Sequence, residues 1–147
     1  MKIPNISIKE MVCPHVYKKY GDAAEKFLDE NLMRVMDVIR NKIVKAPMII
    51  NNGTTLTQRG LRCNICQLCA DKTKAGKLYL TAHSFGKGMD FTSTKYTPKQ
   101  LRELILKNEH LLPCKIRMES EIDAPTWVHI DVLCAPDQKE KVYVFRA

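Results

Sequence analysis

The sequence predicts a single domain, residues 1–147, in which helices and strands are combined, and three observations lead to this expectation. The chain of 147 residues, 45% of them hydrophobic and 27% charged, has the size and composition of one soluble globular domain. Apolar residues with a helical period run through residues 22–44, and a strong helix start lies at Thr97. Three short strand candidates then close the chain.

The longest predicted helix covers residues 22–44. Its apolar residues recur at steps of three and four and form one stripe that would face a core: Leu28, Leu32, Val35, Met36, Ile39 and Ile43. Pro47 closes this helix, and residues 48–50 form a short buried-strand candidate. Before the helix, residues 1–20 are expected to be irregular except for one helical turn after Ser7, which Pro14 ends.

Capping residues and alternation predict the remaining elements. Residues 71–77 are expected to be an exposed lysine-rich loop, and residues 78–80 a strand that leads to His83. Thr97 can cap a helix that begins at Pro98, and Gln100 can complete a capping box. Strands are predicted over residues 114–118, 127–133 and 142–145. In the second of these, alternation places Val128, Ile130 and Val132 on one face and Trp127, His129, Asp131 and Leu133 on the other.

Three residues have the side chains of a catalytic zinc site: His83, Asp90 and His129. Two imidazoles and one carboxylate form a ligand set that leaves the fourth position of zinc open. Gly86 and Gly88 lie between the first two ligands and allow a bend that brings both side chains toward one point. The sequence therefore predicts one zinc ion in a hydrolytic site.

Two stretches of the chain resemble motifs of a known superfamily. The stretch Thr81-Ala82-His83-Ser84-Phe85-Gly86-Lys87-Gly88-Met89-Asp90 resembles the S-x-H-x-x-G-x-A-x-D motif of zinc D-alanyl-D-alanine carboxypeptidases and dipeptidases. That superfamily also includes phage endolysin peptidases and the amino-terminal hedgehog signalling domain. The stretch Trp127-Val128-His129-Ile130-Asp131 is similar to its W-x-H-x-D strand, and Gly60-Leu61-Arg62 to its G-Y-R segment. The likeness covers most of the chain, with Thr81 replacing the motif's serine and Gly88 its alanine.

The resemblance implies an α+β domain whose mainly antiparallel sheet, with packed helices, holds zinc through the three ligands and leaves the fourth position to water. It also implies that Arg62 is a catalytic and substrate-binding residue, which binds a substrate carboxylate or stabilises the developing oxyanion. Thr81, at the motif's serine position, is the other expected substrate-binding residue.

The general base is where this chain departs from the family pattern. Many members carry a carboxylate three residues before the last histidine, and this chain has Thr126 there. Asp123 matches the position where the hedgehog domain keeps a glutamate, so it is the expected catalytic base, with Glu121 next and a solvated loop carboxylate as the alternative. Asp131 is expected to be a structural partner of His129.

The six cysteines suggest a second metal. Without a secretion signal they are expected to be reduced thiols and not a disulfide framework. Cys63, Cys66 and Cys69, at two-residue spacing, could give three thiolates to a structural metal, with Cys13, Cys114 or Cys134 as the fourth ligand. The alternative is that all six are ordinary buried or reduced thiols. His15 is expected to be a surface or packing residue with no ligand nearby.

Charge and hydropathy limit which partners and which cellular location are expected. The formal net charge of +8 favours an anionic partner such as nucleic acid or a cell wall, or serves solubility alone. Nucleic acid is disfavoured because aromatic residues do not alternate with the basic ones. No apolar run approaches the ~20 residues of a membrane span, and no signal peptide is recognised. The protein is expected in the cytoplasm as synthesised, with release to the cell wall by a phage-type route.

Together these features predict a zinc metallopeptidase that cleaves peptidoglycan peptides near D-alanine. The alternative, suggested by Thr126, is a catalytically silent zinc domain that binds a partner. The oligomeric state stays open.

Overall fold

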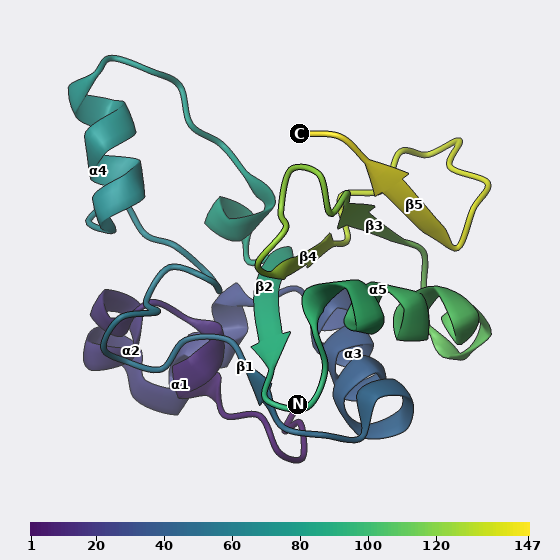
Figure 1. The fold of residues 1–147 in the computed structure, drawn as a ribbon. Helices are drawn as coiled ribbons and strands as arrows, with labels where there is room; N and C mark the ends of the chain where they lie inside the picture. The colour runs from purple at the N-terminus through teal and green to yellow at the C-terminus, as the bar shows by residue number, and fades with distance from the viewer.

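A five-stranded sheet is the centre of the molecule in the computed structural model, which describes residues 1–147 (Figure 1). The strands are β1 (Met48–Ile49), β2 (Gly88–Ser93), β3 (Ile116–Glu119), β4 (Val128–Asp131) and β5 (Val142–Phe145), in the order β1-β2-β4-β3-β5. Only β3 and β5 pair in parallel, and the other pairs are antiparallel. The expectation of an α+β domain with a mainly antiparallel sheet is confirmed.

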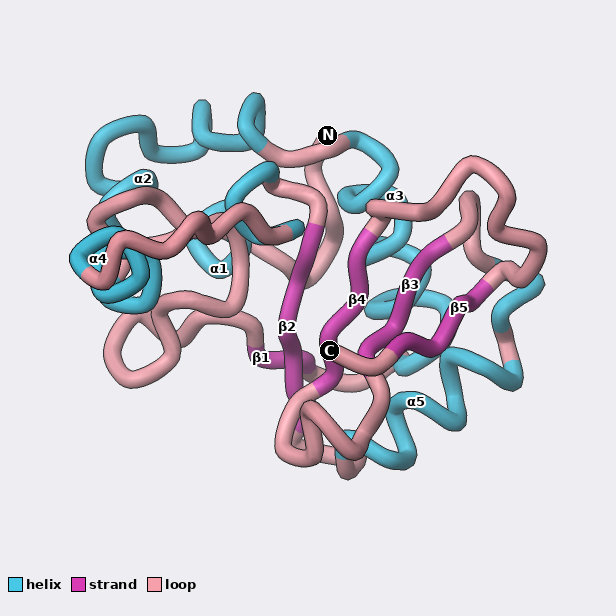
Figure 2. Tube along the Cα trace, turned by 90° about the horizontal axis from the view of Figure 1, so that it is seen from above, coloured by secondary structure: helices cyan, strands magenta, loops and turns pink.

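The helices lie on both sides of β2. The α-helices are α1 (Ile8–Met11), α2 (Pro14–Tyr20), α3 (Glu30–Val38), α4 (Gln67–Lys74) and α5 (Pro98–Lys107), and the shorter or irregular helices are η1 (Gly21–Phe27), η2 (Ile39–Val44), η3 (Ala82–Phe85) and η4 (Glu109–Leu111). Seen from above, α3 and α5 accompany β3, β4 and β5, whereas α1, α2 and α4 lie on the opposite side of β2 (Figure 2). No helix has both the length and the apolar composition that crossing a bilayer requires.

Alternation along the strands separates a core face from a polar face. Met89, Phe91, Val128, Ile130, Ile116 and Met118 are all fully buried in one hydrophobic core with residues of α3 and α5. The residues between them carry polar side chains, including Asp90, His129, Asp131, Arg117 and Glu119. The alternation expected for residues 127–133 is therefore confirmed, and the second face of the sheet is free to carry a polar site.

The helix predicted over residues 22–44 is interrupted, although its stripe is buried as expected. A 3-10 helix ends at Phe27, Leu28 is extended, and α3 starts after Asp29, whose carboxylate caps the helix by accepting from the Asn31 N–H at 2.8 Å. The Asp29 N–H also donates to the carbonyl oxygen of Gly86, 2.9 Å away. The break exists because the turn before β2 docks on the backbone here, a contact that helical periodicity does not reveal.

Three further expectations about residues 1–80 were wrong. The helical turn over Ile8–Met11 ends before Pro14 as expected, but residues 14–20 are not irregular, because Pro14 occupies the first position of α2, where its missing N–H costs nothing. The predicted loop at residues 71–77 is largely covered by α4. Residues 78–80 form no strand, because no neighbouring strand pairs with them, and both Leu78 and Leu80 are exposed. By contrast, the capping box at Thr97 and Gln100 is formed as expected.

Candidate metal centre

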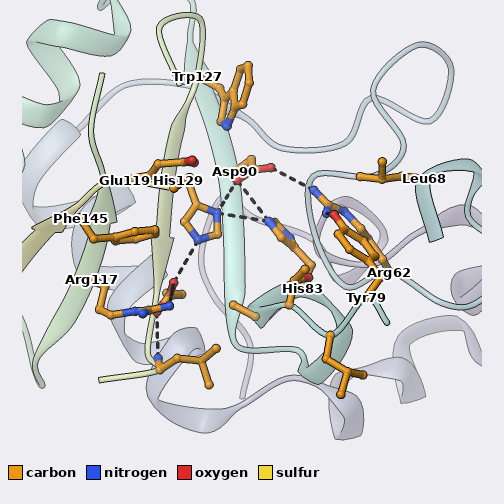
Figure 3. Close-up of a pocket in the computed structure, with 16 residues that line it drawn as sticks. Arg62, Leu68, Tyr79, His83, Asp90, Arg117, Glu119, Trp127, His129 and Phe145 are labelled. Atoms are coloured by element: carbon orange, nitrogen blue, oxygen red, sulfur yellow. Dashed lines mark hydrogen bonds and ion pairs between the residues drawn. The ribbon is translucent and has the colours of Figure 1, made fainter. Parts of the chain in front are cut away.

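The three predicted metal ligands meet at one point on the polar face of the sheet (Figure 3). The Nε2 atom of His83 lies 3.2 Å from Nδ1 of His129 and 3.3 Å from Oδ1 of Asp90. Nδ1 of His129 lies 2.7 Å from the same carboxylate oxygen. All three side chains are buried, with exposed fractions of 3–8%. His83, Asp90 and His129 thus each present one ligand atom to a common centre, although His83 and His129 are 46 positions apart in the chain.

Sheet register and a tight turn create this arrangement. Asp90 of β2 pairs directly with His129 of β4, so their side chains stand side by side on the same face. His83 comes from the 3-10 turn η3, which Gly86 terminates with a φ of +66°. A side chain at Gly86 would also collide with the carbonyl oxygen of Phe27, only 2.0 Å from the position of a Cβ. The glycine bend was correctly expected to bring the two ligands together.

The spacing of the ligand atoms fits a zinc ion. Nitrogen and oxygen ligands at about 2.0–2.1 Å from a tetrahedral zinc stand about 3.3–3.4 Å apart. Two of the three separations, 3.2 Å and 3.3 Å, have this size. The third, 2.7 Å, is a hydrogen bond between His129 and Asp90. Three protein ligands with an open fourth side are the arrangement of catalytic zinc.

Each histidine is held by a second contact through its other ring nitrogen. Nδ1 of His83 lies 2.9 Å from the carbonyl oxygen of Gly60, and Nε2 of His129 lies 3.1 Å from Asp131. Asp131 in turn accepts two hydrogen bonds from Arg117, at 2.8 and 2.9 Å. Such contacts fix each ring so that its other nitrogen points toward the candidate metal position. The structural role expected for Asp131 matches this geometry.

The three side chains of the cluster differ in how readily they bind a proton, and a metal cation would take the place of the proton on one of them. Burial lowers the pKa of His83 below its ordinary value, so this ring is neutral at pH 7. Burial would also lower the pKa of His129, but hydrogen bonds to Asp131 and Asp90 outweigh it and raise that pKa to about 9. Burial works to raise the pKa of Asp90, yet its hydrogen bonds with His129 and His83 hold it below the usual range. With a pKa of about 9, His129 is the ring of the cluster that is protonated at pH 7 when no metal is bound.

A cavity of about 460 Å³ opens onto the three ligands. Arg62 and Thr81, the predicted substrate-binding residues, both line it. Arg62 donates to the Tyr79 hydroxyl at 3.1 Å and lies 3.4 Å from the second oxygen of Asp90. The Thr81 hydroxyl is buried and has no hydrogen-bond partner within the protein. The cavity thus contains a fixed cation next to the candidate metal position, whereas the Thr81 hydroxyl is covered by the protein.

Asp123 lies outside this cavity. Its carboxylate accepts hydrogen bonds from the Arg146 side chain, at 2.7 and 3.3 Å, and from the Ala147 N–H at 2.9 Å. These contacts hold its pKa below the ordinary value. Neither Asp123 nor Glu121 lines the cavity.

Glu119 is a cavity residue that the sequence reasoning missed. The register of β3 with β4, continued by one residue, places it across from His129 (Figure 3). It lines the cavity, its carboxylate forms no hydrogen bond or ion pair, and burial raises its pKa. The signal was present, because Ile116 and Met118 alternate with Arg117 and Glu119 in the same way as in the neighbouring histidine strand.

The cysteines also gather, but not in the predicted combination. Cys13, His15, Cys63 and Cys66 form a second group that could hold a metal ion. Cys69 packs beside these thiols without belonging to the ligand group. Cys63, Cys66 and Cys13 gather as the possible metal site required, but Cys69 is not in the group, and the expectation that His15 has no ligand nearby was wrong. The Cys13-x-His15 spacing was the overlooked signal.

Comparison of the chain with protein-family models, with curated proteins and with solved structures finds no match. The function of the protein is therefore inferred from the geometry of the site.

Proposed function

We propose that this protein is a zinc-dependent peptidase that hydrolyses cell-wall peptides near D-alanine, with a fold of the hedgehog and D-alanyl-D-alanine peptidase type. The observation that carries the proposal is the meeting of His83, Asp90 and His129 at zinc-like spacing beside a cavity that contains Arg62. The chemistry supplied by a bound zinc ion is polarisation of a carbonyl oxygen and activation of water at neutral pH.

Arg62 favours a substrate that ends in a carboxylate. Its guanidinium is held between the Tyr79 hydroxyl and Asp90, and its side chain is only 10% exposed. A cation in such a sheltered place binds a carboxylate more strongly than one in open water. Thr81 also lines the cavity and is the second substrate-binding residue in this proposal. Trp127 and Phe145 contribute apolar surface to the cavity, which suits the small methyl side chain of alanine.

Glu119 is the proton-transfer group in this proposal. It lies on the cavity side of β3, across from His129, and its carboxylate has no competing partner. A carboxyl group whose pKa is raised by burial is better suited to accept and return a proton near neutral pH than an exposed one. Before Asp123 could transfer a proton in the cavity, its carboxylate would have to break its hydrogen bonds with Arg146 and the Ala147 N–H.

The test is hydrolysis of a peptide ending in D-Ala-D-Ala by zinc-loaded protein. Glu119→Gln is expected to lower kcat by about 10²–10⁴-fold while zinc content stays the same. Asp123→Asn is the matched control and is expected to keep kcat within a few-fold. An equal loss of kcat in both variants would show that Glu119 is not the proton-transfer group. The absence of hydrolysis of any cell-wall peptide between pH 5 and 9 would contradict the peptidase proposal.

A second candidate function is a zinc-containing domain that binds a partner without catalysis. Two observations favour it: Thr126 replaces the expected carboxylate, and Asp123 is engaged by Arg146. In that case zinc binds with the same stoichiometry, but a D-Ala-D-Ala peptide binds in the cavity and is not cleaved. Calorimetric titration of the peptide, with Arg62→Ala as control, separates the two functions.

A further inference from the structure

Four potential ligand atoms converge at the start of α2. They belong to Cys13, His15, Cys63 and Cys66, and all lie within 4.8 Å of one another. Nδ1 of His15 is 3.6 Å from the Cys63 sulfur and 3.9 Å from the Cys66 sulfur. The two sulfurs of Cys63 and Cys66 are 3.9 Å apart. Residues 48 and 51 positions apart in the chain thus direct sulfur and nitrogen toward one centre.

The three separations among His15, Cys63 and Cys66 are close to those of a tetrahedral zinc site, and the Cys13 sulfur lies within 4.8 Å of the other ligand atoms. With zinc–sulfur bonds of about 2.3 Å and zinc–nitrogen bonds of about 2.0–2.1 Å, sulfurs stand about 3.8 Å apart and sulfur and nitrogen about 3.5–3.6 Å apart. The observed 3.6 and 3.9 Å distances agree with this geometry within a few tenths of an ångström. All six cysteines are free thiols, so no disulfide competes for these sulfurs.

The cluster lies where two distant segments are already joined by backbone contacts. The Cys13 N–H donates to the Leu61 carbonyl oxygen, and the Leu61 N–H donates to the Met11 carbonyl oxygen, both at 2.9 Å. Gly60 permits this approach, since a Cβ there would lie 2.1 Å from the Met11 oxygen. A metal bound just beyond these hydrogen bonds would fasten the segment that starts at Gly60 to the start of α2.

We propose that Cys13, His15, Cys63 and Cys66 bind a structural zinc ion that anchors the Gly60–Cys66 segment. Three thiolates and one imidazole select zinc or a similarly thiophilic divalent cation, and four protein ligands leave no position for water or substrate. The site is therefore closed, in contrast to the open set at His83. The proposal does not rest on the peptidase function.

Fastening this segment also supports the other site. The Gly60 carbonyl oxygen contacts His83 Nδ1, and the Arg62 side chain contacts Asp90. Both groups lie within the anchored segment, between α2 and the cavity. Loss of the cysteine-bound ion is thus expected to loosen Arg62 before it disturbs the sheet that carries Asp90 and His129.

The experiment is metal analysis combined with cobalt spectroscopy. Protein purified with zinc is expected to contain two ions per chain, and Cys63→Ser and His83→Ala are each expected to contain one. Cobalt-loaded wild type and His83→Ala should both show the near-ultraviolet thiolate-to-cobalt band, because only this site contains sulfur. Cys63→Ser should lack that band.

Cys69→Ser is the matched control, since this thiol packs against Cys13 and Cys66 without joining the ligand group. It should keep both ions and the full thiolate band. Loss of an ion in Cys69→Ser, with retention in Cys13→Ala, would replace the proposed ligand set by the Cys63, Cys66 and Cys69 combination and overturn the proposal.

One measurement requires no substitution and therefore remains informative if a variant does not fold. In wild-type protein, bound zinc should protect Cys13, Cys63 and Cys66 from alkylation, and removal of zinc by a chelator should expose the partly accessible Cys63 first. Equal alkylation with and without zinc, or a Cys63–Cys66 disulfide in zinc-treated protein, would overturn the proposal. Failure of peptide hydrolysis would leave these readouts unchanged, so the two proposals fail separately.

Discussion

Among single residues, Asp131 is the one that most directly controls how His129 presents its free nitrogen. It is 1% exposed, contacts Nε2 of His129 at 3.1 Å and is held by Arg117. Asp131→Asn removes the charge that orients and polarises the ring. We expect the zinc affinity of the histidine site to fall by about 10–100-fold, as measured by competition with a chelator.

Asp123→Asn is the control for this substitution, because Asp123 is also paired with an arginine but does not contact a ligand. Its zinc affinity should equal that of the wild type. An Asp131→Asn protein with unchanged affinity would show that the ring of His129 is positioned by packing alone.

The proton on His129 predicts how metal uptake depends on pH. The raised pKa of His129, about 9, means that this ring is protonated at pH 7.5, whereas the lowered pKa of His83 means that this ring is already neutral. A metal needs both rings neutral, so zinc binding should release about one proton at pH 7.5, and affinity should rise with pH until about pH 9. Calorimetry in two buffers of different ionisation enthalpy measures this release.

The measurement is made on Cys63→Ser, so that thiol protons do not contribute. Zinc uptake without net proton release would mean that the ring is neutral before the metal arrives and that its contacts with Asp90 and Asp131 do not raise its pKa.

At the level of elements, α5 supports the connection between β3 and β4 through one buried arginine. Arg102 is 6% exposed and donates to the carbonyl oxygens of Glu119, Ala124 and Trp127 at 3.1, 2.8 and 2.9 Å. Because Arg102→Leu removes the donor from three carbonyl oxygens at once, it should lower the free energy of unfolding by about 2 kcal/mol or more, as measured by urea denaturation.

Arg34→Leu provides the comparison, since Arg34 pairs with Glu30 on the exposed surface of α3. Its free energy of unfolding should change by less than about 1 kcal/mol. Similar unfolding midpoints for the two variants would show that the β3–β4 connection does not depend on Arg102.

For the whole molecule, bound metal should raise the stability of the fold. A ligand that binds only the native state stabilises it by about 4 kcal/mol when its concentration is a thousand times Kd. Chelation is therefore expected to lower the Tm of wild-type protein and, by a smaller amount, that of His83→Ala and of Cys63→Ser. Differential scanning calorimetry with and without chelator measures these shifts.

The variant with both substitutions is the control, because it retains neither complete ligand set. Its Tm should not respond to the chelator. A wild-type Tm that is equally insensitive would mean that neither site holds metal tightly enough to stabilise the fold.

Features that depend on neighbouring residues could be predicted from the sequence alone. The capping box at Thr97 and the alternation around His129 involve residues only a few positions apart, so their pattern is readable directly. The three ligands His83, Asp90 and His129 were identified in the same way, from residue type, a glycine bend and a resemblance. The break before α3 was not predicted, because it depends on a contact between Asp29 and Gly86.

The sequence by itself determined which strand face is polar and which residues could serve as ligands at the candidate zinc centre, because periodicity and side-chain chemistry are local properties. Only the tertiary structure decided that Glu119 lies across from His129 and that Asp123 forms an ion pair with Arg146. It also decided that His15, and not Cys69, lies in the ligand group with Cys13, Cys63 and Cys66. The physical reason is that each of these contacts joins segments far apart in the chain, and their approach is set by sheet register and core packing.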